Sequence, residues 1–376
     1  MKFLHLSDLH IGKMLNAVSM INEQINFFAQ VIDYIRSEKP YAVVIAGDIY
    51  DRSVPSTEAV LAFDDFLTAL VESGAVIIII SGNHDSPARL NFASRLLSHR
   101  QLFLYGAFNG SLQKLTFNDE TGAVNFWLLP FINPASVRSF HQGANIQDYN
   151  AALDFVLKNA DIDYSMRNIF VSHQYYTKAG LSLERSESEL KPIGGLDAID
   201  ISLIKNFDYA ALGHLHGRQK AGEEHICYAG SPLKYSFSEA HHKKSVNLVE
   251  IREKGNLTVT ALPIKPIHNM QIIKGKLSTL LDKPEPCEDY IYAILTDEEE
   301  IIDPMEKLRN IYPNIMKLDF DNSRTALDLT EAYQGGEAES LSAYDLFSEF
   351  FLLNQGSVMS DEQIGIVQAL LGGGNE

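Results

Sequence analysis

The sequence predicts an α/β fold in which buried strands alternate with helices, and three observations support this prediction. Short apolar runs recur in the first part of the chain. A helical pattern of apolar residues separates the first two runs, and a polar motif follows each of five runs. Continuous apolar runs of this length are typical of strands buried on both faces, and their alternation with helices is typical of layered α/β domains.

Five apolar runs are predicted to be strands. They occupy residues 2–6, 41–46, 75–80, 168–171 and 209–212. The third run consists almost entirely of β-branched residues, which favour extended backbone. Functional groups in α/β sheets lie beyond the carboxyl ends of the strands. The residues that directly follow these five runs are therefore predicted to form the functional site.

The first predicted helix lies between the first two strands. Its apolar residues recur at spacings of four, three, four and three, as expected for one helix face, and Pro40 follows its end. These residues are Ile21, Ile25, Phe28, Ile32 and Ile35. A second helix is predicted to begin after Asp85, with Ser86 as its N-cap and Pro87 in its first turn.

The polar motifs all lie within residues 1–265, which are predicted to form one domain. Residues 266–321 alternate strand-like and helix-like segments, which predicts a second, small α/β domain. Residues 322–340 are polar, acidic and contain glycine, as is typical of a linker. Residues 341–376 carry two amphipathic helical stretches on either side of Gly356.

Composition limits the class of protein. A chain of 376 residues, 45% of them hydrophobic, can bury a large core and is not a disordered chain. Its two cysteines argue against a disulfide scaffold, and their number excludes a cysteine-rich zinc site. The sequence has no apolar run of about 18 residues and no signal-peptide pattern, so we expect a cytoplasmic protein without membrane contact.

The formal net charge of −18 is unusual for a protein that handles nucleic acid. The charge is unevenly distributed, because residues 270–376 carry 21 acidic and only 7 basic side chains. Part of the remaining acidity lies in the motifs, where bound cations would reverse the local potential. A polyanionic substrate is therefore not excluded, but the C-terminal third is not predicted to be its main binding surface.

Five short motifs follow the predicted strands and carry the chemistry. They are Asp8-Leu9-His10, Gly47-Asp48-Ile49-Tyr50-Asp51, Gly82-Asn83-His84-Asp85, Ser172-His173 and Gly213-His214-Leu215-His216. A lone histidine at a strand end is more often structural than ligating. Five motifs in this order instead predict one shared site. Two cations held close together activate water and neutralise charge in phosphoester hydrolysis, so the motifs predict a two-metal phosphoesterase.

Seven side chains are candidate metal ligands. One ion is assigned to Asp8, His10 and His216, and the other to Asn83, His173 and His214. Asp48 is the candidate carboxylate that bridges the two ions. Mixed oxygen and imidazole ligands favour Mn²⁺ or Fe²⁺, with Zn²⁺ as a further possibility, over Mg²⁺.

His84 is the candidate general acid or charge-stabilising residue, because it follows the candidate ligand Asn83 and would point across the site. Asp51 is predicted to fix the tautomer of His84 through its carboxylate. For Arg52, a phosphate contact and a surface salt bridge remain equally open. The run from His241 to Lys244 is interpreted as a solvated turn, with a contact to a phosphate backbone as the alternative.

These motifs resemble those of the calcineurin-like metallophosphoesterase superfamily and, within it, the SbcD family of nuclease subunits of bacterial SbcCD complexes. The residues that carry the resemblance are 3–13, 81–86, 192–195, 212–216 and 230–239. It implies a layered metallophosphoesterase β-sandwich flanked by helices. It also implies that residues 266–321 are a DNA-capping domain and that residues 341–376 form helices docking on an SbcC-like ATPase.

The resemblance further implies a Mn²⁺-dependent DNA nuclease. Such a nuclease would be an ATP-dependent exonuclease on double-stranded ends and an endonuclease on single strands and hairpins. It would act as a homodimer within a heterotetramer, in DNA repair, recombination and replication. The alternative is a stand-alone phosphoesterase for nucleotides or phosphoproteins, which needs neither the small domain nor docking helices. A non-catalytic adaptor is disfavoured by the complete ligand set.

Overall fold

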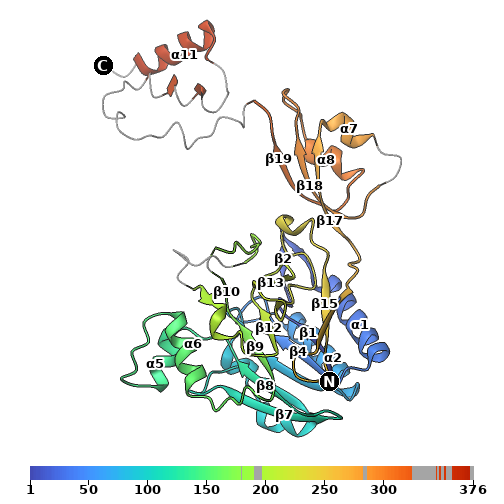
Figure 1. The fold of residues 1–376 in the computed structure, drawn as a ribbon. Helices are drawn as coiled ribbons and strands as arrows, with labels where there is room; N and C mark the ends of the chain where they lie inside the picture. The colour runs from blue at the N-terminus through green and yellow to red at the C-terminus, as the bar shows by residue number, and fades with distance from the viewer. Residues whose placement is uncertain are drawn as a thin grey trace. The chain divides into compact units, whose positions relative to one another are not determined.

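The computed structural model describes residues 1–178, 180–189, 197–282, 286–323, 344, 347–348, 351–352 and 358–372. The chain divides into two compact units, residues 1–267 and 268–376 (Figure 1). The division lies two residues from the boundary expected at 265. Residues 192–195, nearly all of the predicted linker and most of the first C-terminal amphipathic stretch lie outside the described residues.

One six-stranded sheet of the first unit has the order β16-β15-β1-β4-β5-β6. Its strands are β1 (Lys2–Leu6), β4 (Ala42–Ala46), β5 (Val76–Ile80), β6 (Leu102–Tyr105), β15 (Ser245–Ile251) and β16 (Leu257–Pro263). β1, β4, β5 and β6 are parallel, and β15 pairs with β1 in the antiparallel direction. The parallel strands therefore all end at one edge, where three of the motifs begin.

A second six-stranded sheet has the order β13-β14-β12-β9-β8-β7. Its strands are β7 (Gln113–Asp119), β8 (Gly122–Leu129), β9 (Arg167–His173), β12 (Tyr209–Gly213), β13 (Gln219–Lys220) and β14 (Ile226–Tyr228). β9 and β12 are parallel neighbours that carry the last two motifs. All five predicted strands are thus confirmed.

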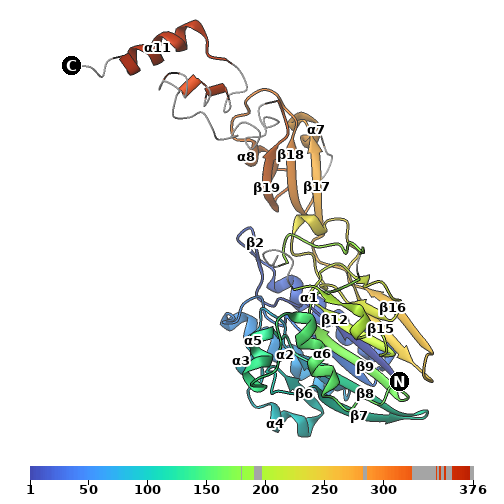
Figure 2. The same ribbon diagram turned by 60° about the vertical axis from the view of Figure 1, so that its left-hand side comes forward.

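The two sheets pack face to face around one apolar core (Figure 2). Phe3 and Ile78 from the first sheet and Phe126 and Tyr209 from the second belong to this core and are fully buried. Burying one such side chain contributes roughly 1.5–3 kcal/mol. This burial on both faces explains why the strands are continuous apolar runs, and it confirms the predicted β-sandwich.

Helices flank the sandwich. α1 (Ile21–Glu38) packs against α2 (Thr57–Glu72), which contacts β5. α5 (Pro134–Phe140) and α6 (Tyr149–Lys158) contribute to a core with residues of the second sheet. α2 was missed by the sequence reasoning, although Ser56 caps it by accepting the Ala59 N–H at 3.2 Å. Its buried residues also recur at helical spacing.

α1 is confirmed as a helix, and Ile21, Phe28 and Ile35 of its predicted face are buried, but the buried face is shifted away from Ile25. Ile25 is 50% exposed, whereas the polar residues Glu23 and Gln24 are buried. The Gln24 amide donates to the main-chain oxygen of His10 at 2.8 Å and accepts the N–H of Gly12 at 3.0 Å. Polar contacts with the first motif, rather than apolar spacing alone, therefore set the rotation of this helix.

The helix predicted after Asp85 is only one turn long. It is α3 (Pro87–Leu90), followed by the equally short α4 (Ser94–Leu97). Ser86 occupies the N-cap position, but its side chain makes no capping hydrogen bond to a described residue. Ala93, between the two turns, has a φ of 58°, which a continuous right-handed helix does not allow.

The second unit contains a parallel sheet with α7 and α8 packed on it. Its elements are β17 (Met270–Gly275), α7 (Leu277–Leu281), β18 (Tyr290–Leu295), α8 (Pro304–Arg309) and β19 (Ile315–Phe320). The second predicted C-terminal stretch is α11 (Asp361–Gly372). In the described part of the chain, no helix is long and apolar enough to span a bilayer.

Candidate metal centre

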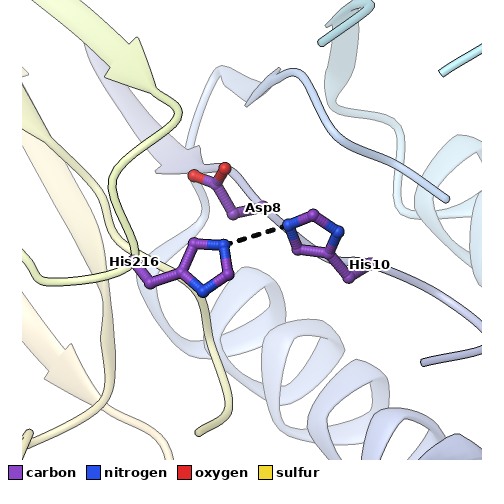
Figure 3. Close-up of side chains that lie close together, drawn as sticks. All are labelled: Asp8, His10 and His216. Atoms are coloured by element: carbon purple, nitrogen blue, oxygen red, sulfur yellow. Dashed lines mark hydrogen bonds between the residues drawn. The ribbon is translucent and has the colours of Figure 1, made fainter. Parts of the chain in front are cut away.

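The five motifs meet because their strands end at the same edge of the sandwich. β1, β4 and β5 are neighbours in one sheet, and β9 and β12 are neighbours in the other. Gly213 pairs in register with His173, so the two histidine motifs of the second sheet begin at the same level. Residues from far apart in the chain, such as His10 and His216, thereby face one another (Figure 3).

The backbone of the candidate ligands is strained. Four of them have φ values in the left-handed region, which non-glycine residues rarely adopt. They are Asp8 (54°), His10 (44°), Asp48 (52°) and His214 (109°). Such conformations cost roughly 1–3 kcal/mol each and persist only where surrounding contacts enforce them. Here the Asp8 N–H donates to the Gly47 oxygen, and the His10 N–H donates to the Asp48 oxygen, each at 3.0 Å.

Two glycines allow the loops to approach so closely. A Cβ atom on Gly82 would lie 2.1 Å from Oδ1 of Asp48. A Cβ atom on Gly213 would lie 2.1 Å from the main-chain oxygen of Ala46 and 2.7 Å from Nδ1 of His173. Neither position tolerates a side chain without movement of the motif loops.

The first predicted group of ligands is brought together. The Nε2 atoms of His10 and His216 lie 3.1 Å apart, and a carboxylate oxygen of Asp8 is within 4.8 Å of ligand atoms on both (Figure 3). All three side chains are buried. Two imidazole nitrogens that point at each other in the interior are well placed to share one cation.

The second predicted group also converges, with Asp48 between the two. Oδ1 of Asn83 lies 3.1 Å from both His173 Nε2 and His214 Nδ1. Oδ2 of Asp48 lies 3.3 Å from His173 Nε2 and 3.6 Å from His10 Nε2. This carboxylate therefore occupies the position expected of a ligand shared by two ions.

The structure corrects one predicted contact of His84. Its Nδ1 lies 2.8 Å from the main-chain oxygen of Asp51, not from the carboxylate. The carboxylate instead accepts a hydrogen bond from Lys13 at 2.8 Å. Because a carbonyl oxygen can only accept, Nδ1 of His84 carries a proton, and Nε2 is the ring nitrogen left for contacts in the site. The ring packs edge-on against His10, with centroids 4.7 Å apart.

Two basic segments near the site behave differently from each other. Arg52 is 77% exposed and lies 3.7 Å from the Asp51 carboxylate, so its surface salt bridge is the alternative that the structure shows. Lys244, in contrast, is 7% exposed and pairs with Glu239 at 2.6 Å. The interpretation of residues 241–244 as a solvated turn is therefore wrong for Lys244, because an internal carboxylate draws it inward.

The electrostatics favour a positive charge inside the site. Burial lowers the pKa of His10 well below its usual value and that of His214 to about 3, so both rings are neutral. Burial also opposes protonation of His173, but the Asp48 carboxylate outweighs it and raises the pKa of His173 to about 9. Positive charge is therefore electrostatically favourable between His173 and Asp48.

Asp85 is a functional residue that sequence reasoning missed. Its carboxylate accepts the N–H groups of Ile49, Tyr50 and Gly82 at 2.9–3.1 Å and so joins the second and third motifs. Burial, together with the Asp48 charge, raises the pKa of Asp85 to about 6. Its place directly after His84 was the available signal.

The residues around His216 were also missed. Glu239 is fully buried, with Oε1 3.3 Å from Nδ1 of His216. Ser188 Oγ lies 2.8 Å from the same nitrogen, and Glu189 accepts the His216 N–H at 2.7 Å. Burial would raise the pKa of Glu239, but Lys244 and His216 hold it well below its usual value, so Glu239 is ionised. No spacing in the sequence connects these side chains to His216.

This donor set fits divalent cations. It combines buried carboxylates, an amide oxygen and imidazoles that converge from five loops, and it favours positive charge. Hard oxygen donors mixed with imidazole nitrogen match Mn²⁺, Fe²⁺ or Zn²⁺ better than an all-oxygen Mg²⁺ site.

Comparison with known proteins agrees with this geometry. Residues 1–218 match the calcineurin-like phosphoesterase family, and residues 266–354 match the type 5 capsule protein repressor C-terminal domain, SbcD_C. The SbcD subunit of nuclease SbcCD from Staphylococcus epidermidis is 32% identical over 375 residues, covering 98% of this chain and 96% of the relative. Its counterpart from Staphylococcus saprophyticus is 32% identical over 326 residues, covering 85% and 84%.

Among solved structures, a dimetal phosphatase from Danio rerio overlaps 69% of this chain and 95% of its own, at 15% identity and a TM-score of 0.41. This overlap is too weak to bear on activity. The family match and the two bacterial relatives decide the assignment. The chain therefore belongs to the calcineurin-like phosphoesterases, a family of metal-dependent enzymes, and within them to the SbcD family of nuclease subunits.

Proposed function

We propose that this chain hydrolyses phosphodiester bonds in DNA with two divalent metal ions, as the nuclease partner of an SbcC-like ATPase. Mn²⁺ is the ion that we propose for both positions. The convergence of two ligand groups on Asp48 carries the proposal, because a shared carboxylate is suited to bridging two metal ions. The near full-length match to a relative named as a subunit of nuclease SbcCD supports the choice of DNA.

Seven side chains hold the ions in this proposal. Asp8, His10 and His216 hold one, Asn83, His173 and His214 hold the other, and Asp48 is shared by both. When bound, such ions activate water and neutralise the charge that develops on the phosphate. The strained loops and their glycines hold the donors in place before binding, so little reorganisation is needed.

His84 acts in this proposal as the proton donor or charge stabiliser at the leaving oxygen. The Asp51 carbonyl holds the proton on Nδ1, and the edge-on contact with His10 fixes the plane of the ring. Nε2 is then the atom that exchanges a proton with the substrate. The Asp51 main chain, rather than its carboxylate, is the group that orients His84.

The second unit and the C-terminal helix have proposed roles in DNA capping and in docking on the ATPase. The match of residues 266–354 to SbcD_C, a domain separate from the phosphoesterase match, supports a role for the second unit that is distinct from catalysis. α11 exposes Ile366, an apolar side chain that a partner surface would cover. The assembly that we propose is a homodimer within a heterotetramer.

The test is cleavage of labelled linear and hairpin DNA in the presence of Mn²⁺, with a chelator as control and a small phosphodiester as a second substrate. We expect Mn²⁺-dependent DNA cutting that increases when the ATPase partner and ATP are added. Turnover of the small ester alone, with the partner and ATP present, would instead support the stand-alone phosphoesterase.

A further inference from the structure

His216 is held at both main-chain groups. Its N–H donates to Oε1 of Glu189 at 2.7 Å. Its carbonyl oxygen accepts from Nζ of Lys244 at 2.9 Å and from the N–H of Ser231 at 3.1 Å. The position from which the imidazole projects is therefore set by contacts that do not involve the ring.

The ring itself lies at one end of a hydrogen-bond relay. Ser188 Oγ is 2.8 Å from Nδ1 of His216 and 2.7 Å from Oε1 of Glu239. A carboxylate only accepts, so the Ser188 hydroxyl donates to Glu239 and accepts the Nδ1–H of His216. The direct contact at 3.3 Å between Glu239 and Nδ1 favours the same tautomer.

This tautomer suits the proposed metal centre. With the proton on Nδ1, the lone pair of His216 is on Nε2, the atom that lies 3.1 Å from Nε2 of His10. The opposite tautomer would place an N–H at the metal position. A group that selects between the two tautomers therefore controls whether His216 is ready to bind a metal.

Lys244 forms a buried ion pair with the carboxylate of this relay. Its Nζ has three acceptors within 2.9 Å, namely Oε2 of Glu239, Oγ of Ser231 and the oxygen of His216. A buried ion pair contributes little net stability compared with apolar residues of the same volume. Because the Lys244–Glu239 pair lies beside the ring nitrogen of His216 that faces away from the metal position, its role is to orient His216.

The second group of ligands has a weaker equivalent. Nδ1 of His173 donates to the main-chain oxygen of Ala46 at 2.8 Å, a neutral acceptor. A carboxylate partner makes an imidazole a stronger ligand than a carbonyl partner does, because charge-assisted hydrogen bonds are stronger. The two metal positions thus differ in the partner of Nδ1: the hydrogen bonds of His216 lead to a carboxylate, whereas His173 bonds a main-chain carbonyl oxygen.

We propose that Ser188, Glu239 and Lys244 form a positioning relay that fixes the tautomer of His216 and makes its metal position the tighter of the two. The inference rests on the proposed ligand role of His216. Ser188, Glu239 and Lys244 act through His216 and do not touch substrate.

The first test uses the metal-free protein and reads the tautomer directly. In ¹⁵N-histidine NMR spectra, with His216 assigned from its loss in His216→Gln, the wild type should show the Nδ1–H form. Glu239→Gln, which removes the carboxylate, should move His216 toward a mixture of tautomers. Ser188→Ala, which keeps the direct 3.3 Å contact of Nδ1 with Glu239 and the buried ion pair, should do so to a smaller extent. Ser238→Ala is the matched control, since Ser238 bonds Ser236 and the main chain of Glu187 instead. An unchanged tautomer in Ser188→Ala and Glu239→Gln overturns the relay.

The second test is calorimetric titration with Mn²⁺, which should resolve two binding events in the wild type. Ser188→Ala and Glu239→Gln should weaken the tighter event by about 10- to 100-fold, the usual effect of losing such a partner, and leave the other event unchanged. Thermal unfolding identifies any variant that fails to fold; Ser188→Ala, which keeps both charges, then decides the outcome.

The outcomes separate the relay from the proposed function. Two wild-type events that Ser188→Ala leaves intact overturn the relay but not the two-metal site. Equal weakening of both events also overturns it. A wild type that binds no Mn²⁺ removes the ligand role of His216 and overturns both.

Discussion

At the residue scale, His84 shows how main-chain geometry prepares a catalytic group. The Asp51 carbonyl and the His10 ring fix its orientation, and His84 does not belong to either predicted ligand group. Its proposed chemistry and metal binding can therefore be separated by substitution.

We expect His84→Gln to lower the rate of DNA cleavage by about 100- to 10,000-fold, the usual contribution of a positioned acid or base. Mn²⁺ affinity should stay at the wild-type level, because glutamine can still contact the Asp51 carbonyl. Single-turnover cleavage and Mn²⁺ titration on the same preparation measure both quantities. Loss of Mn²⁺ from this variant would show that His84 is a ligand.

Asp119 contributes stability away from the site. Its carboxylate accepts two hydrogen bonds from Arg167 at 2.6 and 3.0 Å, and this contact holds the pKa of Asp119 below its usual value. A depressed carboxyl pKa stabilises the folded state above the unfolded pKa of about 4, and this stability is lost as the pH falls below it.

Asp119→Asn should therefore lower the free energy of unfolding by about 1–2 kcal/mol at pH 7, with partial exposure keeping the value small. The difference from wild type should shrink below about pH 4, because Asp119 then takes up a proton in the unfolded wild-type chain and the unfolded state gains stability. Urea unfolding of both proteins at a series of pH values, with a chelator present to remove metal ions, measures this difference in the free energy of unfolding. Asp154→Asn, in an exposed pair with Lys158, is the control and should change little. A difference that does not depend on pH would contradict the ion-pair explanation.

At the element scale, the ends of the strands rather than their interiors hold the site together. β12 ends at Gly213, where a Cβ atom would meet both the Ala46 oxygen and the His173 ring. β17 ends at Gly275, where a Cβ atom would make an ordinary contact with Leu280 at 3.6 Å. The two strand ends form a matched pair.

Gly213→Ala should weaken Mn²⁺ binding by at least about 10-fold, because the motif loops must separate to admit the methyl group and a misplaced ligand loses affinity. Gly275→Ala should leave Mn²⁺ binding unchanged. Calorimetric titration of both variants, after circular dichroism has shown that they fold, checks this. Equal Mn²⁺ affinities of Gly213→Ala and Gly275→Ala would show that the motif loops can move apart more easily than their close packing indicates.

At the scale of the whole molecule, metal binding should stabilise one compact unit and not the other. All candidate ligands belong to residues 1–267, while residues 268–376 form their own core. A ligand that binds only the folded state adds stability according to its concentration relative to Kd.

Mn²⁺ at 100 times its Kd should add about 2.7 kcal/mol per site to the first unit, and a chelator should remove it. Hydrogen exchange read by mass spectrometry should show slower exchange in β9 and β12 with Mn²⁺, whereas peptides from β17 to β19 should not respond. Protection in both units would show that they unfold as one.

The sequence by itself determined the strands, the order of the motifs and the set of candidate ligands. These features are local, since apolar runs specify buried strands and each motif directly follows its strand. Parallel pairing then brings three motifs to one edge of the first sheet and two to one edge of the second, and the packing of the two sheets joins the two groups. The signals for α2 were also local, namely Ser56 as its N-cap and apolar residues at helical spacing, but the sequence reasoning missed this helix.

Tertiary structure alone decided which atoms hold the ligands. The examples are the contact of Gln24 in α1 with the first motif, the contact of the Asp51 carbonyl with His84, and the relay from Ser188 to His216. Each joins segments whose relative position no local pattern encodes. The burial of Lys244 likewise depends on where Glu239 is placed. Such contacts follow from packing, because a buried polar group must find its partner wherever the fold brings one within reach.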